Sequence, residues 1–150
     1  MKSYRDLEVC KESKRLAVLV HKLSLSFPKF EMFEEGSQIR RSSKAVTAAI
    51  VEVYSRRRYK ADFVKFLVYA QSECDETIVH LDFLYETESF KDESMFTQLK
   101  CEYESLSKRI NNFIQWVEDN LNDFAKPATS NRQPETGNLL WKFLRDWLLV

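Results

Sequence analysis

The sequence predicts an all-α protein: an up-down-up-down antiparallel four-helix bundle with a short extra C-terminal helix. The first observation is that 150 residues include only two glycines and three prolines, whereas an all-β chain needs many more turn residues. The second is that large apolar residues recur at spacings of three and four over four long stretches. The third is that these stretches are joined by short polar segments, which favours a bundle of antiparallel neighbours.

The first stretch begins at the N-terminus, where Ser3 with Asp6 three residues later indicates a helix cap. Its apolar residues continue to the Phe27-Pro28 boundary, so a helix of about 20 residues, roughly 30 Å long, is expected. Pro28 then starts a corner, which we expect Phe30 and Phe33 to anchor.

The second stretch begins near Gly36 and Ser37, which offer either a break or a new helix cap. Apolar residues resume after Gln38, and alanines among them keep one face thin enough for a neighbouring helix to approach closely. A turn over residues 55–60 should follow. The third stretch carries Phe63, Phe66, Leu67, Ala70, Cys74, Ile78, Leu81, Leu84 and Tyr85, and the fourth runs from Phe96 to Phe124.

The bundle is therefore predicted over residues 1–124, followed by a linker over residues 125–137 and a C-terminal segment over residues 138–150. Nine of the thirteen residues in this C-terminal segment are large and apolar, so it needs a cover. Three alternatives stay open: the segment folds back onto its own bundle or a neighbouring subunit, it docks a protein partner, or it lies on a membrane surface. The last is less favoured, because the segment lacks the excess of basic residues that is typical of helices bound to membrane surfaces. The candidate partner-docking residues are Leu140, Trp141, Phe143, Leu144, Trp147 and Leu148.

Catalytic and metal-binding patterns are missing from the sequence. The sequence nominates no nucleophile–base pair for His21 or His80. The chain contains no Glu-x-x-His pair and no glycine-rich phosphate loop. Cys10, Cys74 and Cys101 lie far apart, and we expect all three to be reduced core residues. No enzymatic activity, metal or cofactor is predicted.

Localisation follows from two absences in the sequence. No segment reaches the roughly 20 apolar residues that span a bilayer, and the charged N-terminus does not resemble a signal peptide. A cytoplasmic protein without a membrane span is expected.

The charges are segregated although 23 basic residues balance 23 acidic ones. Residues 40–60 contain seven basic side chains against Glu52, and residues 73–93 contain eight acidic ones against Lys91. Arginines with interleaved Tyr54 and Tyr59 are typical of binding to nucleic-acid phosphates and bases. The alternative is structural, because cations also complement a helix C-terminus or pair with acidic residues. The candidate nucleic-acid-binding residues are Arg40, Arg41, Lys44, Arg56, Arg57, Arg58 and Lys60.

Several sequence motifs match those of a known family over roughly residues 4–124. They include the run from Tyr4 to Val9, Phe27-Pro28 with Glu31 and Phe33, the run from Ser37 to Ser42, Glu52 followed by Arg56, and Phe63 with Phe66, Leu67 and Ala70. With these motifs the chain resembles the bacterial four-helix-bundle family, also called the ribosomal-RNA intervening-sequence protein family.

This resemblance implies a cytoplasmic bundle that assembles as a homopentamer and has no established enzymatic activity. The chain is also similar to the accessory variability protein of diversity-generating retroelements, which implies nucleic acid and a reverse transcriptase as partners. It departs from the family pattern at Ala49-Ile50-Val51-Glu52-Val53, where an Asn-Ile-Ala-Glu-Gly run is usual, and at Gln71-Ser72, where a Gly-Ser pair is usual. Residues from Asn138 onward lie outside the pattern.

Two functions therefore stay open. In one, an oligomer binds nucleic acid through its basic residues. In the other, a structural or adaptor bundle pairs its basic and acidic segments between subunits and docks a partner through the C-terminal segment. A ligand pocket in the bundle core has no convergent polar groups to favour it.

Overall fold

The four-helix bundle is confirmed by the structure, a computed structural model that describes residues 3–57 and 59–120. The described part consists of four α-helices and two short 3-10 helices: η1 (Tyr4–Asp6), α1 (Glu8–Ser24), η2 (Lys29–Met32), α2 (Glu35–Ser55), α3 (Lys60–Glu86) and α4 (Glu93–Asn120). The predicted linker and C-terminal helix lie outside the described residues, as does Arg58.

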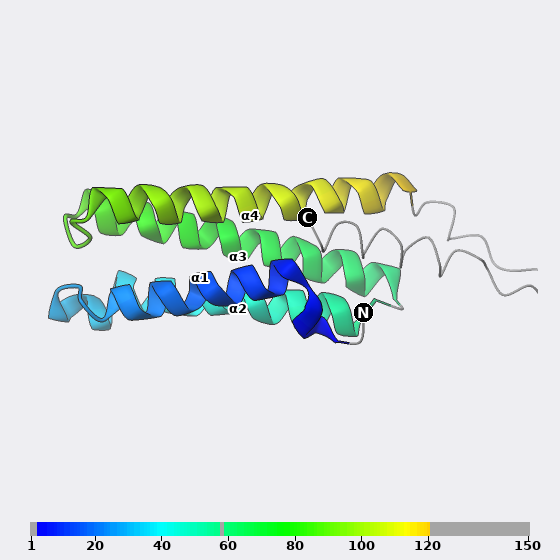
Figure 1. Cartoon of the computed structure of the whole chain (residues 1–150), viewed down its shortest axis with the longest axis horizontal. Helices are drawn as coiled ribbons and strands as arrows, with labels where there is room; N and C mark the ends of the chain where they lie inside the picture. Colours follow the sequence, from blue (N-terminus) through cyan, green and yellow to red (C-terminus); the bar gives the residue numbers. More distant parts are fainter. Residues whose placement is uncertain (1–2, 58, 121–150) are drawn as a thin grey trace, which may run out of the picture.

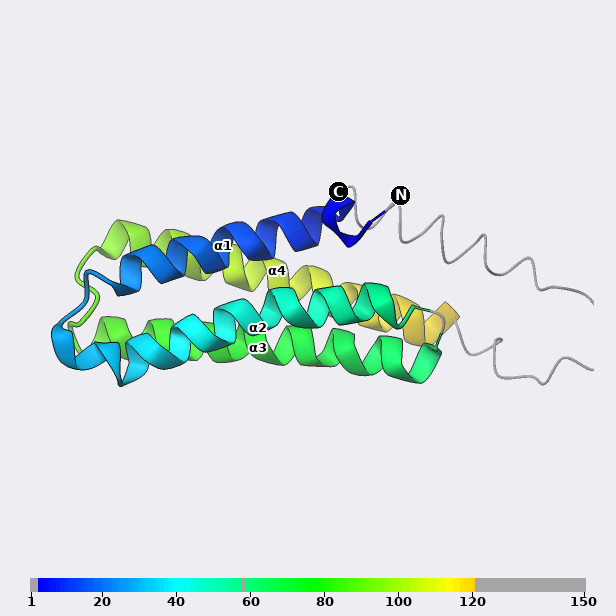
Figure 2. The same ribbon diagram turned by 90° about the horizontal axis from the view of Figure 1, so that it is seen from below.

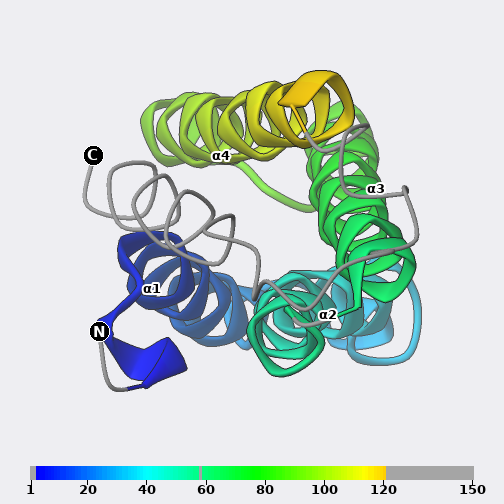
Figure 3. The same ribbon diagram turned by 90° about the vertical axis from the view of Figure 1, so that its right-hand side faces the viewer.

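The helices alternate in direction, and each packs beside the next one along the chain (Figure 1). Among helices that are neighbours in the bundle, packing is most extensive between α2 and α3 and least extensive between α1 and α4. In the end-on view, α1 and α2 lie along one side of the bundle, α3 forms the adjacent side, and α4 lies opposite α1 and α2 (Figure 3). Because the helix number is even, the start of α1, the connection from α2 to α3 and the end of α4 lie toward the same end of the bundle (Figures 1 and 2).

Two helix boundaries differ from those expected. The Ser3–Asp6 capping box is present, with Ser3 N–H donating to the Asp6 carboxylate at 3.0 Å, but it caps η1, and α1 begins only at Glu8. The other difference is Gly36, which does not interrupt the second helix, because α2 begins at Glu35.

The core contains large side chains from all four helices, with a layer of buried hydroxyl groups among them. The Thr77 hydroxyl donates to Ser42 Oγ at 2.9 Å, and the Thr47 hydroxyl donates to Ser13 Oγ at 3.1 Å. These bonds satisfy polar groups away from water and fix the heights at which α1, α2 and α3 meet. The largest fully buried side chains include Tyr103, Phe63, Phe113, Leu16, Ile39 and Leu67.

The expectation that Phe30 and Phe33 anchor the corner is wrong, since they are 62% and 86% exposed. The buried residue is Glu31, which is 3% exposed. Its Oε1 accepts a hydrogen bond from Ser89 Oγ at 2.7 Å, and its Oε2 accepts one from Gly36 N–H at 3.3 Å. The carboxylate therefore joins the α1–α2 corner to the connection between α3 and α4. A pattern of apolar residues could not reveal a buried glutamate.

The cysteine prediction is confirmed for Cys10 and Cys74, which are buried, and wrong for Cys101, which is exposed on α4. Burial is the main cause that raises the pKa of both buried thiols. They therefore stay protonated at neutral pH and behave as small apolar side chains.

Candidate nucleic-acid interface

The predicted basic residues fall into two groups on α2 rather than one surface. Arg40, Arg41 and Lys44 lie in the first half of the helix, and Arg56 and Arg57 lie at its end. Twelve positions separate Lys44 from Arg56, which corresponds to about 18 Å along the axis.

Arg40 has a structural role. Its guanidinium donates to Ser24 Oγ at 3.1 Å and to the Met32 carbonyl at 2.7 Å. Because Ser24 ends α1 and Met32 ends η2, Arg40 holds both sides of the corner against α2.

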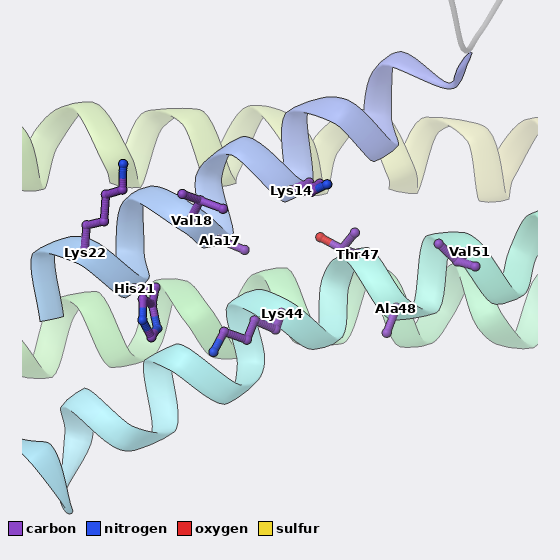
Figure 4. A pocket seen from close by; sticks show the side chains of 9 residues that line it. All are labelled: Lys14, Ala17, Val18, His21, Lys22, Lys44, Thr47, Ala48 and Val51. Carbon is purple, nitrogen blue, oxygen red and sulfur yellow. The ribbon is translucent and has the colours of Figure 1, made fainter. Parts of the chain in front are cut away.

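Arg41 and Lys44 are both exposed, about one turn apart on α2, and their neighbours differ. Arg41 is near Glu73 of α3, and its positive charge partly offsets the burial and the Glu76 charge that raise the pKa of Glu73. Lys44 instead lines a groove between α1 and α2, together with Lys14 and Lys22 (Figure 4).

The second group forms a compact cluster where α2 ends. The Arg57 guanidinium lies 4.2 Å from the centre of the Tyr54 ring and donates to the Tyr54 carbonyl at 2.6 Å. Exposed Arg56 lies 3.6 Å from the carboxylates of both Glu52 and Asp62. Exposed ion pairs of this length contribute little stability.

The structure adds two residues from the N-terminus to this cluster. The Tyr4 ring meets the Tyr54 ring edge-on, with centroids 6.4 Å apart, and the Arg5 guanidinium lies 4.8 Å from the centre of the Tyr4 ring. Arg5, Tyr4, Tyr54 and Arg57 thus form a row in which each aromatic ring contacts a cation. We call these residues, with Arg56, the basic end. Sequence reasoning missed Tyr4 and Arg5 because some 50 positions separate them from Tyr54.

The basic end is chemically suited to phosphate. Arg5 and Arg56 are exposed, and guanidinium N–H groups match phosphate oxygens, whereas Arg57 already donates to the Tyr54 carbonyl and contributes mainly its charge. Tyr59 next to the cluster is 64% exposed, so its face is available to stack on an unpaired base. Arg58 and the side chain of Lys60 lie outside the described part of the chain.

Residues 3–57 and 59–120 contain no group of three or more potential ligands placed to hold a metal ion. None of their helices combines the length and the hydrophobicity needed to cross a membrane.

The sequence model of the 23S rRNA-intervening sequence protein matches residues 5–112. The chain belongs to this family. The match confirms the resemblance drawn from the motifs, and it spans Arg5, the two arginine groups of α2 and most of α4. The last 38 residues, including the C-terminal segment, lie beyond the match to the 23S rRNA-intervening sequence family.

Among solved structures, the chain is similar to a protein of unknown function from the S23 ribosomal protein family of Bacteroides thetaiotaomicron. The two are 25% identical, the TM-score is 0.65, and the match covers 71% of this chain and 95% of the other. No curated protein matches the chain. Neither the S23 description nor that of the 23S rRNA-intervening sequence family is the description of an enzyme.

Proposed function

We propose that this protein is a non-enzymatic accessory factor that binds the phosphate backbone of nucleic acid, RNA above all, through its basic end. The observation that carries the proposal is the row of Arg5, Tyr4, Tyr54 and Arg57 beside Arg56. Binding through phosphates and stacked rings needs no fixed sequence. The family description, which refers to 23S rRNA, favours RNA as the partner.

The protein works as a homo-oligomer in the cytoplasm in this proposal, with a pentamer as the number that the family resemblance implies. Repetition of the basic end in each subunit multiplies weak phosphate contacts into useful affinity. The ion pairs of Arg56 with Glu52 and Asp62 do not prevent this role, because exposed pairs exchange readily for a phosphate.

Fluorescence anisotropy with structured RNA and with duplex DNA tests the proposal at low and near-physiological salt. The test variant is Arg5→Glu with Arg56→Glu, both at exposed positions. The matched control is Lys29→Glu with Lys91→Glu, which makes the same charge change on the exposed corner and connection at the other end. We expect the wild type to bind with a steep salt dependence, the test variant to lose at least tenfold in affinity, and the control to lose much less.

Two outcomes would contradict the proposal. If the wild type does not bind even at low salt, the arginines are structural. Equal losses in the test and control variants would mean that net charge, and not the basic end, governs binding.

A second function is favoured by the composition of residues 138–150, in which nine of thirteen are large and apolar. In this alternative the bundle is an adaptor that docks a protein partner, such as the reverse transcriptase implied by the resemblance, through this C-terminal segment. Removing residues 138–150 would then abolish partner binding at every salt concentration, whereas RNA binding through the basic end would persist.

A further inference from the structure

The groove between α1 and α2 is an apolar surface with a cationic edge. Its volume is about 580 Å³, and small or aliphatic side chains such as Ala17, Val18, Ala48 and Val51 line it (Figure 4). Lys14, Lys22 and Lys44 also line it, and none of the three forms an ion pair with any residue of the described part. A further unsatisfied group is His21 Nδ1, which is buried without a hydrogen-bond partner among the described residues.

The outer face of α3 carries acidic side chains together with Lys65, whose Nζ lies 5.6 Å from the centre of the Tyr69 ring. Val68, Tyr69, Val79 and Phe83 are 42–50% exposed, and their spacing places them along one side of the helix. Asp75 and Glu76 are exposed on the same side. We call these four apolar and two acidic residues the acidic stripe. The Asp75 carboxylate accepts a hydrogen bond from Ser107 Oγ at 2.7 Å, and the Glu76 carboxylate lies 3.4 Å from His80 Nε2. An apolar helix face with helical spacing is the kind of surface that fits into a groove between two helices.

The groove and the acidic stripe lie at the same height along the bundle. The bond from Thr77 to Ser42 places this part of α3 beside α2, so Asp75 and Glu76 lie near the level of Lys44. The bond from Thr47 to Ser13 places Lys14 at a neighbouring level on α1. Copies related by rotation about an axis parallel to the helices can therefore bring one surface against the other without sliding.

We propose that the acidic stripe of one copy of this chain docks into the groove of the next copy. The inference rests on the homo-oligomer of the proposed function and names the surfaces that build it. Val68, Tyr69 and Val79 cover the apolar lining, while Asp75 and Glu76 pair with the lysines at its edge. Because the two surfaces differ, the contact is head-to-tail, and repeated contacts of this kind close into a ring when the rotation allows it.

The charges within α3 agree with this arrangement. Burial is the largest cause that raises the pKa of Glu73, and the neighbouring Glu76 charge is the next. Lysines from an adjacent copy would relieve this repulsion. The contact also leaves the basic end uncovered, so assembly and RNA binding use separate residues.

A charge swap tests the contact, with mass measured by light scattering after gel filtration. The groove variant is Lys14→Glu with Lys44→Glu, and the stripe variant is Asp75→Lys with Glu76→Lys. We expect each to shift the wild-type oligomer toward monomer, with at least a tenfold weaker association, because like charges then face each other. A variant with all four substitutions should recover the oligomer, since the charges again match.

The controls separate assembly from folding and from other occupants of the groove. Lys91→Glu with Lys108→Glu changes the net charge as much as the groove variant does, at exposed positions elsewhere, and should leave the oligomer intact. Circular dichroism verifies that each variant is folded, and Val79→Asp repeats the disruption from the apolar part of the stripe.

Four outcomes would overturn the inference. The wild type could be monomeric at tens of micromolar, or its oligomer could be unaffected by the groove or stripe variant. The variant with all four substitutions could stay monomeric, or assembly could depend on residues 138–150 and not on the swapped charges. The last result would identify the C-terminal segment as the occupant of the groove. Failure of RNA binding alongside a successful charge swap would refute the proposed function and leave this contact standing.

Discussion

The two ends of the bundle use the same residue types in opposite ways. At one end, which we call the closed end, Glu31 is buried and bonded to Ser89 and Gly36, and Arg40 donates to Ser24 and Met32. At the basic end, Arg5 and Arg56 are exposed, and the neighbouring contacts are stacked rings and 3.6 Å ion pairs.

The difference separates residues that stabilise the fold from residues that would carry the proposed function, along a single helix. A charged group whose donors or acceptors are all satisfied inside the protein cannot be removed without loss of stability. An exposed cation that pairs weakly contributes little to the fold and is available to an outside anion. Arg40 and Arg56, both carried by α2 and its C-cap, therefore have different expected effects when replaced.

The largest effect should come from Glu31→Ala at the closed end. The substitution leaves Gly36 N–H and the Ser89 hydroxyl without their acceptor in a buried site, and we expect a loss of about 3 kcal/mol. Urea denaturation measures this loss. Glu31→Gln, which keeps one oxygen acceptor and the same size, should lose less; equal losses would mean that the carboxylate is not what holds this end.

Gly36→Ala should have the next largest effect. A Cβ at this position would collide with the Glu31 carbonyl oxygen and lie 3.1 Å from the carbonyl carbon. Backbone atoms cannot rotate away as a side-chain tip can, so we expect a loss of about 1–3 kcal/mol. Ser37→Ala is the neighbouring control. A melting temperature unchanged by Gly36→Ala would show that the corner shifts freely.

The arginine pair gives the sharpest comparison of the two ends. Arg40→Ala should destabilise by about 1–2 kcal/mol, because it removes two hydrogen bonds that hold the corner. Arg56→Ala should change stability by less than about 0.5 kcal/mol and should weaken RNA binding. The comparison fails if Arg56→Ala is the more destabilising of the two, or if Arg40→Ala alone reduces RNA affinity in a fully folded protein.

The smallest effect should come from Glu73→Gln, midway along α3. Because burial, and next Glu76, raise the pKa of Glu73 in the folded state, the folded protein holds this proton more tightly than the unfolded chain. The charged carboxylate therefore lowers stability as pH rises through the raised pKa. We expect the glutamine variant to gain a few tenths of a kcal/mol at neutral pH, after solvent screening, and nothing below the ordinary value of 4.5. Urea titrations at pH 7 and pH 4 measure the difference; a gain that persists at pH 4 would exclude the charge as its cause.

The periodicity of apolar residues was sufficient to predict the fold, because an amphipathic helix places an apolar residue on its buried face every three or four positions. The residues from Phe63 to Tyr85 predicted α3 within a few residues of its true bounds, Lys60–Glu86. The corner was harder, since hydrophobicity favoured Phe30 and Phe33 as anchors, whereas the buried group is Glu31. A glutamate is buried only where the tertiary structure supplies donors, and its donor Ser89 is 58 positions away.

The candidate site was predictable only in part for the same reason. The arginines and Tyr54 were visible as a local run in the sequence. Whether each has a structural role depends on contacts with residues that are far away in the sequence. Arg40 meets Ser24 and Met32 only after the corner folds, and Arg5 joins Arg57 only through the meeting of Tyr4 with Tyr54. Similarly, Lys14 and Lys44 share a groove because α1 and α2 are antiparallel.

The start of α1, the α2–α3 connection and the end of α4 lie toward one end of the bundle. This arrangement affects how members of such a family can acquire new partners. Because α4 ends toward the same end of the bundle as the basic end, any segment attached after Asn120 starts at that end. Tethering through a short linker corresponds to an effective concentration on the order of millimolar, so even a weakly binding attachment would meet a nucleic acid or a competitor held there. Exchange of the sequence after α4 can therefore redirect the protein to a new partner while every residue of the bundle stays the same.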